Sequence, residues 1–192
     1  MPKSIVPALV LVAFVLEPLA AFADDASKAA VTAAFAKMAQ AKSYRMTMHA
    51  GAGDMTQEYV APDRRHMSGP SMEMISIADD TWMKVNGKWQ HIPKTAAGSG
   101  AMSSGAMGRG PGGPVAKPPE ADVKFVGNQD CQGQPARVYS FSMPASSGPP
   151  SQSKFWIGAS GYPCRMEMGG TGSASSMEWS DWGAPLRIKP PM

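Results

Sequence analysis

The chain has 192 residues, a formal net charge of +3 and 17% charged residues. This length fits one domain with an adequate core. The 18 Lys and Arg residues form no dense cluster, and a nucleic-acid-binding domain needs a concentrated basic face. We therefore expect no nucleic-acid partner.

The N-terminus has the three parts of a secretory signal peptide. Lys3 supplies a positive charge, Ile5–Leu16 is an apolar run, and Ala21-Phe22-Ala23 is a small-x-small cleavage site. The run of about a dozen residues is shorter than the roughly 20 that span a bilayer, which argues against an N-terminal membrane anchor. We expect cleavage after residue 23, and residues 24–192 then form a single periplasmic domain without stable membrane insertion.

The two cysteines, Cys131 and Cys164, favour a disulfide bond. An exported protein meets an oxidising compartment, and an even number of cysteines is typical of pairing there. In the chain-entropy model a bond closing this loop stabilises the fold by about 3–4 kcal/mol. The alternative is a pair of buried free thiols.

Residues 25–42 are expected to form one helix. Asp24 or Asp25 can cap its start, and alanine is abundant in it. Four apolar residues recur at helical spacing and predict a face that packs on a sheet: Val31, Phe35, Met38 and Ala41.

After residue 43 the apolar period changes to two, which is typical of half-buried strands. Asn86-Gly87 predicts a type I′ hairpin in which Lys84 faces Trp89 and Trp82 faces His91. Both tryptophans would then share one face and pack in the core against the helix. Strands are expected at 44–49, 55–59, 72–75, 82–85, 88–92, 122–127, 136–143, 154–159, 162–168 and 175–182.

Residues 94–119 are rich in Gly, Ser, Pro and Ala without periodicity, and we expect a flexible insertion there. The other links between strands are of hairpin length, which predicts antiparallel pairing. The expected fold class is therefore α+β: a curved antiparallel β half-barrel packed on an N-terminal helix.

Motifs of catalysis are weak in this chain. Gly108–Gly113 has the spacing of a dinucleotide fingerprint, but neither a strand nor a helix flanks it. Gly158–Gly161 is a tight turn between strands, because a nucleophile elbow needs Gly-x-Ser-x-Gly. His49, His66 and His91 lack the spacing of a zinc enzyme. We expect no enzymatic activity and no cofactor.

Methionine is unusually frequent, with 16 residues. Pairs such as Met46 and Met48, Met72 and Met74, or Met166 and Met168 have i, i+2 spacing, so each pair points to one face of a strand. Flexible thioether side chains can line a core or adapt to a variable apolar ligand. Together with histidine they also suit Cu(I), so a copper-binding protein is an alternative.

The order of features resembles the LolA-like superfamily of periplasmic lipoprotein carriers, including LppX-like lipid-binding proteins. The stretches that carry the resemblance are Asp80–Trp89, Ala136–Phe141 with Phe155–Gly158, and Trp179–Gly183 with the tail Ile188–Pro191. The resemblance implies a half-barrel with an apolar cavity that binds acyl chains of lipids or lipoproteins.

We therefore expect a monomeric, non-enzymatic periplasmic protein that binds a lipid or a lipoprotein acyl chain. The alternatives are a Met/His copper-binding protein and a structural or interaction domain without a ligand. The residues expected to line the cavity are Tyr44, Met46, Met48, Met72, Met74, Trp82 and Trp89.

Overall fold

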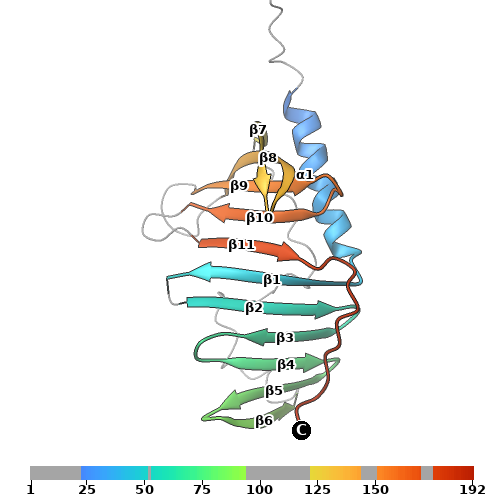
Figure 1. Ribbon diagram of the computed structural model, residues 1–192, viewed down its shortest axis with the longest axis vertical. Coiled ribbons are helices and arrows are strands. Elements are labelled where there is room, and N and C mark those ends of the chain that lie inside the picture. Colours follow the sequence, from blue (N-terminus) through green and yellow to red (C-terminus); the bar gives the residue numbers. More distant parts are fainter. Residues whose placement is uncertain (1–22, 52, 94–121, 144–150, 170–174) are drawn as a thin grey trace, which may run out of the picture.

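The computed structural model describes residues 23–51, 53–93, 122–143, 151–169 and 175–192. One helix, α1 (Ala23–Ala39), precedes the strands in the chain (Figure 1). The strands are β1 (Ser43–Ala50), β2 (Gly53–Val60), β3 (Arg64–Ser68), β4 (Glu73–Ile77), β5 (Asp80–Val85), β6 (Lys88–Pro93), β7 (Lys124–Cys131), β8 (Gln134–Met143), β9 (Ser151–Gly158), β10 (Pro163–Met168) and β11 (Ser175–Ser180).

The strands form one curved antiparallel sheet in the order β6-β5-β4-β3-β2-β1-β11-β10-β9-β8-β7. Neighbours in the sheet are also neighbours in the chain, except that β1 pairs with β11 in the middle. The first and last strands are thus joined by hydrogen bonds, and the sheet edges are β6 and β7. The expected α+β half-barrel with an N-terminal helix is confirmed.

Local sequence explains the tight turns. Asn86 and Gly87 both have positive φ, 52° and 76°, as the expected type I′ hairpin requires. The resulting register pairs Lys84 with Trp89 and Trp82 with His91, as predicted. Residues 158–161 form the expected turn between β9 and β10, closed by a 2.8 Å hydrogen bond from the Gly161 N–H to the Gly158 carbonyl.

The helix packs on one end of the sheet, against β7, β9 and β10. Val31 is fully buried, and Phe35 stacks on Phe155 with ring centroids 4.9 Å apart. The predicted apolar helix face is therefore confirmed, although the helix ends at Ala39 and Ala41 lies beyond it. We name the side of the sheet that carries Phe155 the helix-side face, and the opposite side the outer face.

The disulfide bond and the C-terminal tail make contacts in addition to the strand pairing. Cys131 and Cys164 are bonded, which is the pair expected from the sequence, and they lie in a second buried cluster with Trp156. After β11 the tail runs along the ends of β1 to β6 (Figure 1). Arg64 donates a 3.0 Å hydrogen bond to the Ile188 carbonyl of this tail, and Ile188 is buried.

One strand was not predicted from the sequence. The β3 segment Arg64–Ser68 contains two adjacent arginines and no apolar alternation, so its own residues do not indicate a strand. It forms because it pairs with β2 on one side and β4 on the other. The expected insertion at 94–119 lies outside the described residues.

Candidate ligand-binding face

Nine methionines share the helix-side face and form two rows that run across the strands. Residues directly opposite each other in an antiparallel pair point to the same side, so the register assigns the face. The first row is Met166, Met177, Met48 and Met55, on β10, β11, β1 and β2. The second is Trp179, Met46, Gln57, Met67, Met74 and Met83, on β11 and β1 to β5, and Met168 extends the face on β10. We call the nine methionines of this set the methionine face.

The helix covers only part of the methionine face. Met46 and Met166 are buried in the core cluster that includes α1, at 3% and 7% exposure. In the described part of the chain, that cluster includes no residue of β3 to β6. Met67, Met74 and Met83 on those strands are half-buried. The face therefore changes from closed core at β9–β11 to a methionine-lined surface at β3–β5.

Tyr44 lies at the border between these two parts. Its ring is 1% exposed and contacts the rings of Tyr59 and Trp182, with centroids 5.1 and 5.0 Å away. Burial raises the pKa of the Tyr44 phenol to about 12, although the charge of Arg65 acts in the opposite direction. The phenol is therefore neutral at any physiological pH and belongs to the packed core.

The outer face carries a ladder of charged side chains on β1 to β5. Arg45 forms an ion pair with Glu58 at 2.8 Å, and Lys84 forms one with Glu73 at 2.8 Å. His66 stands between the two carboxylates, with Nε2 3.3 Å from Glu73 and Nδ1 3.7 Å from Glu58. The hydrogen bond from Lys84 is the main cause that lowers the pKa of the Glu73 carboxyl.

Trp82 and Trp89 belong to this outer face, which corrects the expectation that they pack against the helix. Trp82 pairs with Ile75 and His91, and Trp89 pairs with Lys84. Period-two alternation places both tryptophans opposite to Met74 and Met83. The sequence established that the two share a face, but it could not show which face the helix covers.

The seven expected cavity residues are therefore not brought together as one wall. Four share the helix-side face: Tyr44, Met46, Met48 and Met74. Met72 lies in the turn before β4, where its carbonyl accepts a 2.8 Å hydrogen bond from the Gly69 N–H. Six members of the methionine face were not among the expected cavity residues: Met55, Met67, Met83, Met166, Met168 and Met177. Met166 and Met168 have the i, i+2 spacing noted in the sequence, whereas the other four are assigned to this face by strand register.

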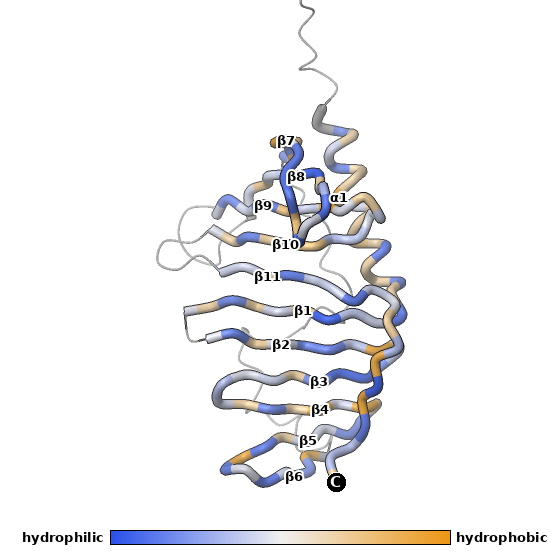
Figure 2. Tube along the Cα trace, viewed as in Figure 1, coloured by the Kyte–Doolittle hydropathy of each residue, from blue (hydrophilic) through white to orange (hydrophobic). Residues whose placement is uncertain are grey.

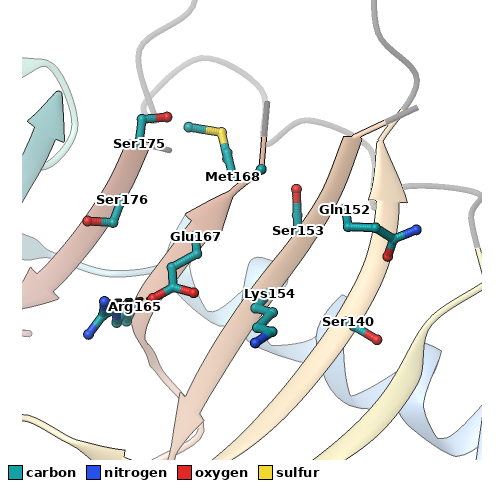
Figure 3. Close-up of a pocket in the computed structure, with 10 residues that line it drawn as sticks. Ser140, Gln152, Ser153, Lys154, Arg165, Glu167, Met168, Ser175 and Ser176 are labelled. Atoms are coloured by element: carbon teal, nitrogen blue, oxygen red, sulfur yellow. Dashed lines mark hydrogen bonds and ion pairs between the residues drawn. The ribbon is translucent and has the colours of Figure 1, made fainter. Parts of the chain in front are cut away.

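A pocket of about 540 Å³ lies at the ends of β8 to β11 (Figure 3). Most of the residues that line it are of polar types and lie on the outer face, among them Lys154, Arg165 and Glu167. Arg165 is held by Glu167 at 2.6 Å and by Glu178 at 3.9 Å. These ion pairs distinguish the pocket from the methionine-lined surface on β3–β5.

Hydropathy does not by itself single out the methionine face. In Figure 2 hydrophilic and hydrophobic residues alternate along the strands, as expected for a sheet with two different sides. Among the described residues, no three of the types His, Cys, Asp and Glu gather as a metal site. In the same part of the chain, no helix is long and apolar enough to cross a membrane.

Comparisons with known proteins agree with this geometry. No protein-family model and no curated protein sequence matches the chain. Among solved structures, LprF from Mycobacterium bovis is similar with a TM-score of 0.66 and 12% identity, over 88% of this chain and 98% of LprF. The Mycobacterium tuberculosis lipoprotein LppX gives 0.65 and 11%, over 86% of this chain and all of LppX. MucB gives 0.51 and 12%, over 88% of this chain and 62% of MucB.

These likenesses establish the architecture. LprF and LppX are matched over nearly their whole length and over most of this chain, so the similarity concerns the fold as a whole. At 11–12% identity, individual binding residues do not transfer between the chains. What the comparisons show is the fold: this chain has the fold of LprF and LppX, the second of which is of the LppX-like kind expected from the sequence.

Proposed function

We propose that this chain is an exported, non-enzymatic protein that binds the acyl chain of a lipid or lipoprotein on the methionine face. The observation that carries the proposal is the run of half-buried methionines on β3 to β5, beyond the core cluster of α1. Unbranched thioether side chains repack easily, so such a surface suits a flexible apolar ligand.

Composition supports the same proposal. Leucine is the ordinary filler of a rigid core, whereas methionine is flexible and specifies a unique packing poorly. Nine methionines in registered rows are therefore better suited to adaptable contact than to a fixed interior. The proposed location is the periplasm, and the proposed state is a monomer.

Native mass spectrometry of protein purified from the periplasm tests the proposal. We expect a mass increment that corresponds to a co-purified lipid and that disappears on delipidation. Delipidated protein should then take up a fluorescent fatty-acid probe. Protein that arrives bare and does not bind the probe would contradict lipid binding and favour a structural domain without a ligand.

A second candidate is a soft metal ion such as Cu(I), and one specific observation favours it. Met166, Met177, Met48 and Met55 stand opposite one another on four adjacent strands of the same face. Neighbouring strands are about 4.8 Å apart, so flexible side chains from three of them can converge on one ion. Thioethers are ligands that Cu(I) prefers.

The two candidates are distinguished by replacing Met48 and Met177 with leucine. This change keeps the surface apolar and removes two thioethers. If the function is acyl binding, probe affinity should change little. If the function is Cu(I) binding, competition with a chromogenic Cu(I) chelator should show a large loss of affinity.

A further inference from the structure

On strands β1 to β5, the helix-side face has a single charged side chain, that of Arg65. The register places it on this face, because it pairs with Tyr59 on β2 and with Ser76 on β4. The carboxylates of the same five strands all lie on the outer face: Asp54, Glu58, Glu73 and Asp80. Arg65 is therefore a cation on the side of the sheet that carries the methionine face, and no carboxylate of these strands accompanies it.

Arg65 has no partner for its charge in the described part of the chain. It forms neither an ion pair nor a side-chain hydrogen bond there, and its Nε is buried without an acceptor. Two arginines of the outer face differ, since Arg45 pairs with Glu58 at 2.8 Å and Arg64 donates to the tail. Native proteins satisfy nearly all buried polar groups, so the missing acceptor needs an explanation.

The surroundings of Arg65 combine hydroxyl groups with an apolar surface. Ser76 lies opposite Arg65, and its Oγ is 3.2 Å from Thr81 Oγ1 on the next strand. In such a pair one hydroxyl donates to the other, which keeps its own O–H for a further acceptor. The half-buried methionines of β3 to β5 stand two residues along each strand, about 7 Å away. Arg65 itself is half-buried, so a group at this surface can reach it.

The chemistry of these groups defines what they would bind. A guanidinium keeps its charge at physiological pH, and its parallel N–H donors match the oxygens of a carboxylate or a phosphate. The hydroxyl pair adds one more donor. A cationic group would be repelled at this place, and a neutral alcohol would leave the charge of Arg65 unpaired.

We propose that Arg65, with the hydroxyl pair of Ser76 and Thr81, binds the anionic head of the ligand, so that the ligand is an amphiphile with a carboxylate or phosphate group. This inference rests on the proposed binding of an apolar chain and adds a charge requirement that an apolar surface alone does not impose. The chain lies along the half-buried methionines of β3 to β5, and the head lies against Arg65.

Three probes with the same decyl chain test the charge requirement: decyl phosphate, 1-decanol and decyltrimethylammonium. Isothermal titration calorimetry on delipidated protein, below the concentrations at which the probes form micelles, measures their affinities. The wild type should bind decyl phosphate at least about tenfold more tightly than decanol, which is the usual effect of a hydrogen bond to a charged group. The ammonium probe should bind most weakly. Inorganic phosphate should bind far more weakly than decyl phosphate, because it lacks the chain.

Substitutions of Arg65 locate the effect. In Arg65→Met the preference for decyl phosphate over decanol should disappear through weaker phosphate binding, while decanol affinity stays unchanged. Arg65→Lys should keep part of the preference, because the charge remains and the fork of donors is lost. The matched control is Arg64→Met, which removes the same charge from the same strand but from the outer face. This control should keep the full preference.

Ligand-free stability gives a second readout. Because Arg65 has no ion pair to lose in the described part of the chain, Arg65→Met should melt within about 2 °C of the wild type. A much lower melting temperature would show that Arg65 serves the fold through a partner within the protein, and the proposal would be refuted.

The binding outcomes separate the anionic subsite from the proposed function. If the wild type binds decyl phosphate and decanol equally, binding of the apolar chain stands and the subsite is refuted. The subsite is also refuted if Arg64→Met loses the preference as fully as Arg65→Met. If inorganic phosphate binds as tightly as decyl phosphate while decanol does not bind, the ligand is a free anion and the proposed function fails. If no probe binds, both proposals fail.

Discussion

The transition from closed core to methionine-lined surface can be tested with one substitution at two positions. Met166 is 7% exposed and belongs to the core cluster with α1, whereas Met74 is half-buried on β4, outside that cluster. Methionine and glutamine have nearly the same length, so Met→Gln adds polarity with little change in shape. The difference between the two sites then reports the local environment.

Met166→Gln buries an amide among Phe155 and other apolar side chains. An unsatisfied amide costs about 1–3 kcal/mol, and the lost apolar contact adds to this cost. We expect a total destabilisation of about 2–4 kcal/mol. For a chain of this size that corresponds to a fall in melting temperature of roughly 5–15 °C.

Met74→Gln should cost less than about 1 kcal/mol, because water can reach part of the amide. Its effect should instead be on ligand binding, since the fluorescent fatty-acid probe loses an apolar contact. Urea unfolding and probe titration on the same samples measure both quantities. If Met74→Gln destabilises the fold as much as Met166→Gln, the surface on β3–β5 is a closed core and our reasoning is refuted.

Three further predictions concern the disulfide bond, one ion pair of the outer face and one turn of the sheet. Reducing the Cys131–Cys164 bond should lower the free energy of unfolding by about 3–4 kcal/mol, measured by urea denaturation with and without reductant. Lys84→Met should raise the pKa of Glu73, measured by NMR titration, because the hydrogen bond that lowers it is lost. Gly87→Ala should destabilise by about 1 kcal/mol, because φ is +76° there while nothing crowds the added methyl group.

Each of these has a contradicting outcome. Two free thiols in denatured, non-reduced protein would show that the disulfide does not form. The folded pKa of Glu73 lies below its unfolded value, so this carboxylate stabilises the fold above the unfolded pKa and loses that contribution as pH falls through the folded pKa. If the stability of Lys84→Met at low pH equals that of the wild type, this contribution of the Glu73 carboxylate is contradicted. Gly51→Ala, with open space and no positive φ, should be neutral; equal costs at both glycines would refute the turn argument.

Local sequence was sufficient for much of this fold. Period-two alternation located most strands, and Asn86-Gly87 determined the hairpin and its register, because these signals depend on residues close in the chain. The same alternation grouped methionines such as Met46 and Met48 on one face. It did not predict β3, because the sequence at Arg64 and Arg65 shows no apolar alternation. This strand forms because it pairs with β2 on one side and with β4 on the other.

Tertiary structure decided which strands meet and which face is covered. The pairing of β1 with β11 joins Met48 to Met177, and Met46 to Trp179, across more than a hundred residues. No local pattern encodes such a contact, because it depends on how the whole sheet packs against α1. The same packing turns Trp82 and Trp89 away from the helix and leaves Gln57 buried without a partner, although each residue alone fits an ordinary strand.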